Sequence, residues 1–389
     1  MKFRPRKIYL RRNLKADENI VRDFLKKNIS DGSLNLREKS PRVLIIRLDY
    51  IGDMLCTTAL MSAIRHKFPN CYLAVLAQTY NRSVIENNTD IDEIFQYIFS
   101  RQLERNPRPN RFLSLLDRVK LLLKLRHMHF DYIIIPNGGR YMSSVQFAWQ
   151  LGAKNVCSID DDFAFDDRVP EHVASRTMEH ETLAGFRVAK KLLGDIIPQD
   201  YYLQLNLPLN LHNQLSDKFP RCDNLPVMAL NFSARVPERV WSLGKWCKLA
   251  VKLAEQNQIV IFGAPDMWNS VEFKFEAASS GLLSLATAGG KVKFWPTESF
   301  LDMAAAIADC DILVSTDGGA VHVGAALRKP VVVLFENRPE KYKRWYPWGV
   351  QYAVVVSQIG LDVAGICIED TFNACMQIQS QNKSIESTL

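Results

Sequence analysis

The sequence alternates short, continuously apolar runs with amphipathic segments, and this alternation constrains the fold more than any other feature. Runs such as 43–48 (VLIIRL) and 71–77 (CYLAVLA) have the pattern of strands that are buried on both faces of a parallel sheet. The segments between such runs have the apolar spacing of helices. The pattern predicts an α/β fold in which helices cover both faces of each parallel sheet.

The alternation occurs twice along the chain. In the first half it continues with a helix over 57–68 and a strand over 131–136, and it restarts after a passage that contains four prolines from 198 to 226. The strands expected after this passage lie at 227–232, 259–263, 311–317 and 330–336. Ligands of open α/β sheets bind beyond the carboxyl ends of the strands. We therefore expect a cleft between two doubly wound domains, lined by the loops after Leu48, Phe232, Gly263 and Thr316.

A chain of 389 residues is long enough for two domains. Its apolar runs are far shorter than the roughly 20 residues of a membrane-spanning helix, and its charged start lacks the apolar segment of a secretory signal. We expect a soluble, intracellular protein. The expected segments are a basic extension over 1–40, an N-terminal Rossmann-like domain over 41–205, a linker over 206–226, a C-terminal Rossmann-like domain over 227–361, and a C-terminal helix and tail over 362–389.

Metal and redox sites find little support in the sequence. The eight cysteines have no CxxC spacing, and no histidine follows at zinc-finger distance. Asp309 and Asp311 resemble a metal-binding pair, but they fall where a helix is expected to pass into a strand. The acidic residues over 160–167 fit a solvated loop. We expect no bound metal.

The net charge of +7 is unevenly distributed. Residues 1–15 hold seven Lys or Arg and no acid, and 101–126 hold eight basic residues against two acidic ones. Part of the second stripe lies on an expected helix over 112–130, and the stripe fits either an ordinary solvated face or a polyanionic partner. No aromatic residue interrupts this helix between its two ends, which argues against nucleic-acid binding. The candidates for facing a phosphorylated acceptor or an anionic membrane are Arg118, Lys120 and Lys124.

The most specific motif in the sequence is the segment 315–335 (STDGGAVHVGAALRKPVVVLF). Asp317 comes at the carboxyl edge of an expected strand, and two glycines then let the backbone approach a ligand closely. The helix that follows offers N–H groups with partial positive charge, for which a diphosphate is the natural occupant. The alternative is a plain strand–turn–helix in which Asp317 caps the helix. The candidates for binding an anion here are Gly318, Gly319, Ala320 and His322.

A second motif covers 43–70. Gly52 permits a tight turn after the strand, and Asp53 begins the next helix at the expected cleft. A carboxylate in that place can accept the proton of an acceptor hydroxyl, so Asp53 is a candidate general base. The alternative is an N-capping aspartate, which this position also favours.

With these residues, the chain resembles the lipopolysaccharide heptosyltransferases of glycosyltransferase family 9. The segment 43–70 is similar to that family's opening signature, 231–250 to its middle element, and 315–335 to its second signature, in which Asp-x-Gly-x-x-His precedes an Ala-rich helix. The three occur in family order and extend over about four-fifths of the chain. Three ordered matches are more specific than any one of them.

The resemblance implies a GT-B fold, with the acceptor on the N-terminal domain and the sugar nucleotide on the C-terminal domain. The implied activity is inverting, metal-independent transfer of a heptose from ADP-heptose to a hydroxyl of a lipopolysaccharide or lipooligosaccharide inner core. Asp53 is then the base, Arg239 holds the donor phosphates in place of the family's usual Lys, and Asp317 meets the transferred sugar. The other implied donor-binding residues are Gly318, Gly319, Ala320, His322, Ser233, Gly263 and Asp266.

The implied partners are a Kdo-lipid A-like acceptor and the anionic cytoplasmic face of an inner membrane, without a separate cofactor and without nucleic acid. Departures from the family pattern leave the donor open: Gly318 replaces a Thr or Ser, Ser242 replaces a Pro, and Glu336-Asn337 replace Gly-Pro. The alternatives are another nucleotide sugar, a protein acceptor, an epimerase of the same fold, and a binding module without turnover. No GxGxxG follows the first strand, which argues against a nicotinamide dehydrogenase.

Overall fold

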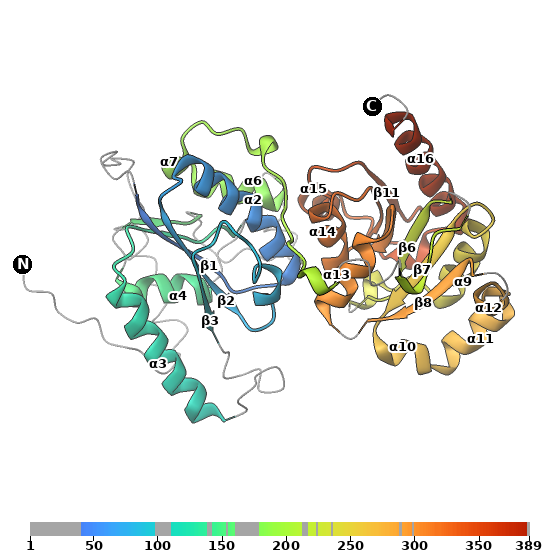
Figure 1. Cartoon of the computed structure of the whole chain (residues 1–389), viewed down its shortest axis with the longest axis horizontal. Coiled ribbons are helices and arrows are strands. Elements are labelled where there is room, and N and C mark those ends of the chain that lie inside the picture. Colours follow the sequence, from blue (N-terminus) through green and yellow to red (C-terminus); the bar gives the residue numbers. More distant parts are fainter. Residues whose placement is uncertain are drawn as a thin grey trace, which may run out of the picture. The chain divides into compact units, whose positions relative to one another are not determined.

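Each half of the chain folds around its own parallel sheet (Figure 1). The chain divides into two compact units, Met1–Tyr201 and Tyr202–Leu389. The computed structural model describes residues 40–97, 110–137, 142–152, 155–159, 179–211, 217–222, 225–234, 236–287, 290–297 and 299–386. The larger part of the predicted basic extension, 1–39, lies outside these residues, as do the acidic residues over 160–167. The predicted linker and the predicted cleft stay predictions.

The sheet of the first unit has the strand order β3-β2-β1-β4-β5. Its central strand is buried from Val43 to Ile46, because β2 and β4 pair with it on both edges and helices cover both faces. Leu44 and Ile46 pack with Leu122 of α3 in one core cluster. The strands are β1 Arg42–Arg47, β2 Tyr72–Gln78, β3 Glu93–Tyr97, β4 Tyr132–Ile134 and β5 Asn155–Cys157.

Two pairs of helices pack on this sheet. Figure 1 shows α2 with α6 on one side of it and α3 with α4 on the other. The helices are α2 Ile51–Lys67, α3 Arg111–His127, α4 Met142–Leu151, α6 Glu181–Val188 and α7 Lys190–Leu193, and the 3-10 turns are η1 Arg82–Val84 and η3 Pro198–Asp200.

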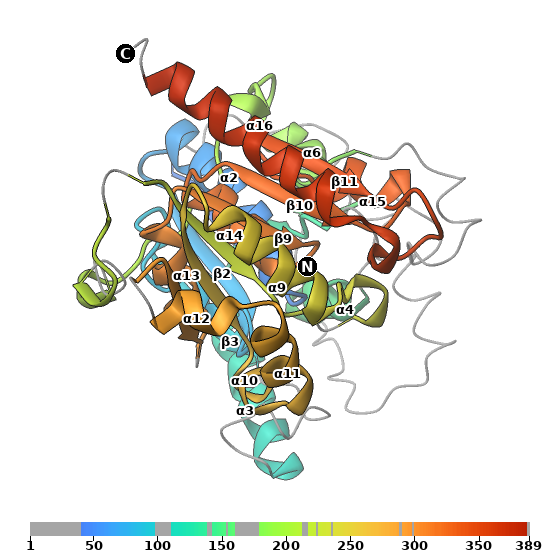
Figure 2. The same cartoon turned by 90° about the vertical axis from the view of Figure 1, so that its right-hand side faces the viewer.

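The sheet of the second unit has the order β11-β10-β9-β6-β7-β8. Its core joins Leu230 of β6 to Trp246 of α9 and Ile378 of α16, and Figure 2 shows α9 and α16 side by side. The strands are β6 Val227–Asn231, β7 Gln258–Gly263, β8 Val292–Pro296, β9 Ile312–Thr316, β10 Val331–Phe335 and β11 Tyr352–Val356. The helices are α9 Leu243–Leu253, α10 Pro265–Asn269, α11 Val271–Ser279, α12 Leu282–Thr287, α13 Phe300–Ala308, α14 Gly319–Ala326, α15 Pro339–Trp345 and α16 Ile368–Glu386, with 3-10 turns η4 Leu209–Leu211, η5 Pro237–Arg239 and η6 Val363–Gly365.

The alternation of strands and helices is confirmed, but several details differ from the sequence-based expectation. The helix after β1 begins at Ile51, six residues before the expected start, so Gly52 lies inside its first turn and makes no tight turn. The sequence analysis also missed four strands, β3, β5, β8 and β11. All four are edge strands, two in each sheet, so their faces are only partly buried and their apolar runs are interrupted.

Both sheets reverse their strand order beside their first strand. In the first unit the reversal falls between β1 and β4, and in the second it falls between β6 and β9. In an open α/β sheet, the loops at the carboxyl ends of two such strands diverge to opposite faces and leave a crevice for a ligand. The topology therefore directs attention to the residues that follow these four strands.

Candidate active site

Asp53 lies in the first turn of α2, directly after β1. The N-cap of this helix is Tyr50, and the Asp53 carboxylate instead accepts a hydrogen bond from Nη2 of Arg47 at 2.7 Å. The interpretation of Asp53 as the N-cap is therefore wrong. Its side chain is 15% exposed, which keeps the carboxylate within reach of a ligand while most of the residues behind it are buried.

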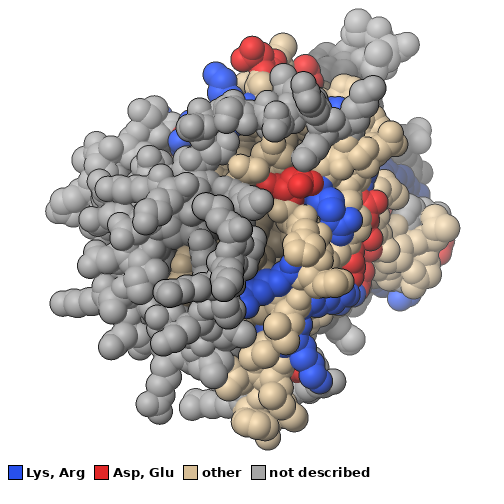
Figure 3. All heavy atoms as spheres, turned by 90° about the vertical axis from the view of Figure 1, so that its left-hand side faces the viewer, with Lys and Arg blue, Asp and Glu red and all other residues tan. Residues whose placement is uncertain are grey.

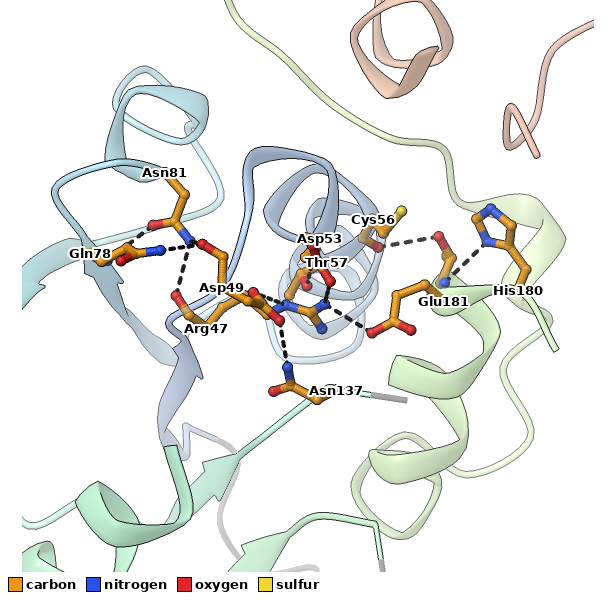
Figure 4. A network of polar contacts seen from close by, with 11 residues as sticks. Arg47, Asp49, Asp53, Cys56, Thr57, Gln78, Asn81, Asn137, His180 and Glu181 are labelled. Atoms are coloured by element: carbon orange, nitrogen blue, oxygen red, sulfur yellow. Dashed lines mark hydrogen bonds and ion pairs between the residues drawn. The ribbon is translucent and has the colours of Figure 1, made fainter. Parts of the chain in front are cut away.

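Arg47 is the centre of a buried ionic cluster behind Asp53 (Figure 4). Its Nε donates to Oδ1 of Asp49 at 2.8 Å, and its Nη2 donates to Oε1 of Glu181 at 2.9 Å as well as to Asp53. Burial lowers the pKa of Arg47, but the attraction of the three carboxylates outweighs burial and raises it. The guanidinium is therefore firmly charged.

Asp49, a third acid beside Arg47, has a raised pKa. Burial raises the pKa of Asp49 well above its usual range, and the negative charges of Asp53 and Glu181 raise it further. Nδ2 of Asn137, which follows β4, donates to Oδ2 of Asp49 at 2.6 Å. The side-chain amide of Asn81 donates to the Asp49 carbonyl at 3.3 Å, and that of Gln78 donates to the same carbonyl. These bonds hold the loop after β1 in one conformation.

Sequence reasoning missed most of this cluster. Arg47 carried a detectable signal, since a charged residue at the end of an otherwise apolar buried strand requires a partner. Asp49, Asn137 and Glu181 carried none, because Glu181 is 134 residues from Arg47 in sequence and only the packing of α6 against α2 brings the two together.

In the second unit, Gly318 is the N-cap of α14 and has extended backbone angles, φ 164° and ψ −171°. No side chain caps this helix, so the interpretation of Asp317 as a capping residue is wrong. A Cβ atom on Gly318 would meet only the carbonyl oxygen of Thr316, at 4.0 Å. The first N–H groups of a helix have no intrahelical partner, and a helix N-terminus without a side-chain cap suits an anion.

Asp317 pairs with Arg239, which comes from the loop after β6. Nη2 of Arg239 lies 3.1 Å from Oδ2 of Asp317, and its Nε donates to Oε1 of Glu336 at 2.9 Å. Glu336 follows β10 and also lies 3.8 Å from Nη1 of Arg338. The Arg239 side chain is 20% exposed, and the two carboxylates are nearly buried. The structure therefore brings Arg239 and Asp317 together, as expected, and adds Glu336.

The other predicted donor-binding residues lie in three places. Ser233 follows β6 and Gly263 is the last residue of β7, and Oγ of Ser233 accepts a hydrogen bond from the Ala264 amide at 2.6 Å. Asp266 is exposed in the first turn of α10. His322 is 3% exposed and packs edge-on against Trp345, with ring centroids 5.8 Å apart.

The three basic residues predicted on α3 differ in their surroundings. Arg118 is only partly exposed: it donates to the Tyr97 hydroxyl at 2.8 Å and to Oε1 of Gln150 at 3.0 Å. Lys120 is exposed, and the largely exposed Lys124 pairs with a carboxylate at 2.7 Å. Three further basic residues of the stripe lie outside the described residues: Arg101, Arg105 and Arg108.

Apolar side chains share the exposed surface of α3 with these lysines. Phe112 is 66% exposed, Leu116 41% and Leu123 54%. The N-terminal half of α3 extends away from the sheet of its unit at the lower edge of Figure 1, and the surface at the lower edge of Figure 3 is mainly uncharged with Lys and Arg close by. In the part of the chain that the structure describes, no helix has the length and apolar character to cross a bilayer.

The aspartates that resemble a metal-binding pair have a structural role in this unit. The Asp311 carboxylate accepts from both terminal nitrogens of Arg221, at 2.6 and 2.8 Å, and from the Val227 amide at 2.8 Å. It therefore ties the start of β9 to the segment that enters β6. Among the described residues, no group of three His, Cys, Asp or Glu is arranged to hold a metal ion.

Comparison with known proteins gives consistent matches in sequence and in structure. The sequence profile of glycosyltransferase family 9 (heptosyltransferase) matches residues 118–364. Lipopolysaccharide heptosyltransferase 2 of Escherichia coli K12 is 23% identical over 313 residues, which cover 76% of this chain and 82% of that protein.

Two solved structures extend the comparison. A glycosyltransferase family 9 protein from Veillonella parvula has a TM-score of 0.67 at 16% identity, with 88% of this chain and 97% of that chain covered. The E. coli heptosyltransferase WaaC with ADP has a TM-score of 0.61 at 16% identity, with 87% and 99% covered. At these identities the structures establish the fold, and the expected GT-B architecture is confirmed.

Proposed function

The chain belongs to glycosyltransferase family 9, and from this premise we propose that it transfers a heptose from ADP-heptose to a hydroxyl of a lipopolysaccharide or lipooligosaccharide inner-core acceptor. One observation carries the proposal: Arg239 and Asp317 meet beside the open N-terminus of α14, at the strand-order reversal of the second sheet. A guanidinium next to unpaired helix N–H groups suits a diphosphate.

In this proposal, the diphosphate of the donor lies against the first N–H groups of α14, with Arg239 beside it. The transferred sugar then lies near Asp317, and the nucleoside near the ends of β6 and β7. The likeness to WaaC with ADP and to a lipopolysaccharide heptosyltransferase 2 supports ADP-heptose as the donor. Another nucleotide sugar remains the competing donor, because Gly318 and Glu336 depart from the family pattern.

The chemistry that we propose needs one base and one stabilised leaving group. Asp53 takes the proton of the acceptor hydroxyl while the hydroxyl oxygen attacks the anomeric carbon, and the bond from that carbon to the diphosphate breaks. Negative charge grows on the departing ADP, and the fixed N–H donors of α14 together with Arg239 stabilise it. Attack opposite the leaving group inverts the anomeric centre, so a single carboxylate suffices.

We further propose that the acceptor is a phosphorylated glycolipid of the Kdo-lipid A type, reached at the cytoplasmic face of an anionic membrane. The support is the exposed face of α3, where Phe112, Leu116 and Leu123 lie with Lys120 and Lys124. An interfacial helix uses this combination, with apolar side chains entering the headgroup boundary and lysines meeting anionic lipid. Arg118 has no part in it, because its hydrogen bonds turn it toward β3 and α4.

Transfer is tested with purified protein, ADP-heptose and a deacylated inner-core acceptor, by measuring release of ADP. We expect acceptor-dependent turnover that Asp53→Asn reduces by roughly 10²–10⁴-fold while ADP affinity, measured by calorimetry, stays close to that of the wild type. Arg239→Ala should instead reduce ADP affinity more than it reduces turnover. Turnover with UDP- or GDP-sugars alone would change the donor, turnover with a protein acceptor would change the acceptor, and ADP binding without any turnover would favour a binding module.

A further inference from the structure

We propose that Glu181 sets the proton affinity of Asp53 because the two carboxylates share the positive charge at one nitrogen, Nη2 of Arg47. The inference rests on the proposed role of Asp53 as the base. In this arrangement Glu181 does not touch the substrate: it is a positioning residue that acts through the guanidinium.

Both carboxylates meet the same nitrogen of Arg47. Nη2 of Arg47 lies 2.7 Å from Oδ1 of Asp53 and 2.9 Å from Oε1 of Glu181. The terminal nitrogen of a guanidinium carries two protons, so each carboxylate receives one. Figure 4 shows both acids on the same end of the Arg47 side chain, with Asp53 coming from α2 and Glu181 from α6.

The burial of the two acids is unequal. The Glu181 and Arg47 side chains are each 1% exposed, whereas that of Asp53 is 15% exposed. Water screens Asp53 to some extent and does not screen Glu181, so the Glu181 charge must be balanced from within the protein. Of the acids in the cluster, Asp53 can gain or lose a proton at the lowest cost in free energy. It is also the acid that a ligand can reach.

The direction of the effect follows from the charges. An Arg that served Asp53 alone would stabilise the carboxylate and make it a weak base. Glu181 takes a share of the same positive charge and adds a negative charge nearby, and both effects favour a proton on Asp53. The cluster therefore holds Asp53 ionised and oriented before the reaction and lets it accept a proton during it.

The groups that face Asp53 and Glu181 from the neighbouring elements agree with this interpretation. Asp49 adds a third carboxylate, on the Nε side of Arg47. Burial raises the pKa of the Cys56 thiol, and Glu181 and Asp53 raise it further, so this thiol stays neutral. His180 is engaged by its Nδ1 atom, which accepts from the Thr182 amide at 3.1 Å.

Glu181 is held in place independently of its charge. His180 is the N-cap of α6, and Oγ1 of Thr182 donates to the Cys56 carbonyl at 3.3 Å, which joins α6 to α2. A Glu181→Gln substitution therefore removes the negative charge while the helix that carries it stays anchored.

The test is the pH dependence of kcat/KM, whose acidic limb reports the base of the free enzyme. We expect Glu181→Gln to move the midpoint of this limb to lower pH by about one unit, because Asp53 then no longer shares Nη2 of Arg47 with a second charged group. Glu181→Asp, which keeps the charge, should restore most of the wild-type profile. The control is Glu179→Gln: Glu179 lies two residues away and pairs with Arg187 at 2.6 Å, outside the cluster, and its loss should leave the profile unchanged.

A second readout separates this inference from the proposed function. Carboxyl carbon NMR of protein with labelled Asp and Glu follows the titration of Asp53 without any transfer, and Asp53→Asn assigns its signal. In the wild type, the Asp53 and Glu181 signals should change at the same pH steps, as expected of a coupled pair. In Glu181→Gln the Asp53 midpoint should fall, and Asp49→Asn should move it in the same direction.

The possible outcomes test the coupling of Asp53 with Glu181 separately from the proposed function. A lower Asp53 midpoint in Glu181→Gln, in a protein without heptose transfer, would uphold the coupling and reject the proposed function. Independent titration of Asp53 and Glu181 in the wild type would overturn the coupling, whether or not transfer is observed. An Asp53 midpoint that stays the same in both variants would also overturn it.

Discussion

Nε of Arg239 donates a hydrogen bond to Oε1 of Glu336 at 2.9 Å, across 97 residues of sequence. By the resemblance to family 9, Arg239 takes the place of a usual Lys and Glu336 takes the place of a usual Gly. The two departures from the family pattern are therefore in contact. A carboxylate beside the proposed phosphate ligand holds the guanidinium when no donor is bound, and it competes with the donor for that guanidinium.

Glu336→Gln should strengthen ADP binding. The substitution removes a negative charge near the diphosphate and frees Arg239 for it, which we expect to be worth about 1 kcal/mol, or roughly fivefold in Kd. Calorimetric titration with ADP measures the change, and Glu340→Gln is the control, since Glu340 pairs with Arg338 at 2.7 Å. Equal or weaker binding by the Glu336 variant would show that Arg239 does not meet the diphosphate.

Gly318→Ala and Gly263→Ala should separate ligand binding from stability. A Cβ on Gly318 enters open space, so the free energy of unfolding should change by less than about 0.5 kcal/mol, while the new methyl group obstructs the N-terminus of α14 and weakens ADP binding. A Cβ on Gly263 would lie 2.8 Å from Cε of Met267 and 2.9 Å from Oγ of Ser233. We expect it to cost about 1–3 kcal/mol of stability. Urea unfolding and calorimetry measure the two quantities, and unimpaired ADP binding by Gly318→Ala would argue against the proposed anion site.

Asp49→Asn should make the free energy of unfolding less sensitive to rising pH. Burial raises the pKa of Asp49 in the folded state, so the folded chain binds this proton more tightly than the unfolded chain, whose Asp pKa is about 3.9. This tighter binding stabilises the folded state fully when the pH is below that value. The stabilisation is lost as the pH rises through the pKa that Asp49 has in the folded state. The amide stays neutral throughout, and the variant should lose less stability between pH 4 and pH 8. Urea unfolding at both pH values tests this; Asp92→Asn, at a half-exposed carboxylate paired with Arg65, is the control.

Arg118→Met should destabilise the first unit, although this residue carries a surface charge on α3. Its guanidinium bonds to Tyr97 and Gln150, and it lies 4.9 Å from the centre of the Phe147 ring. Loss of these contacts should cost about 1–3 kcal/mol. Lys120→Met on the exposed side of the same helix should change the stability by less than about 0.5 kcal/mol. Thermal unfolding of the two variants gives the comparison, and equal effects would contradict the inward placement of Arg118.

The double variant Leu116→Ser, Leu123→Ser should bind vesicles that contain anionic lipid at least about tenfold more weakly than the wild type, because each buried methylene contributes about 0.8 kcal/mol to interfacial binding. Salt should weaken the wild-type association, since the lysines contribute electrostatically. The control is Val271→Ser, Phe275→Ser, a pair that is 85% and 68% exposed in the other unit. If both double variants bind alike, α3 is an ordinary solvated helix.

Local patterns in the sequence predicted much of this protein. The central strands were found from continuous apolar runs, since a strand covered on both faces must be apolar at every position. The turn at Asp317 was found, and a helix was expected soon after β1, because a strand, a polar residue and a helix follow one another within a few residues. The edge strands were missed, because a partly exposed strand lacks the continuous apolar signal.

The sequence by itself determined the central strands and most of the helices that follow them, and which side chains stand at the carboxyl ends of these strands. The tertiary structure decided the partners of those side chains: Glu181 and Asp53 with Arg47, Glu336 with Arg239. The physical reason is distance along the chain. Strand order brings Glu336 to Arg239 across 97 positions, and helix packing brings Glu181 to Arg47 across 134. A buried charge is stable only beside the partner that this packing supplies.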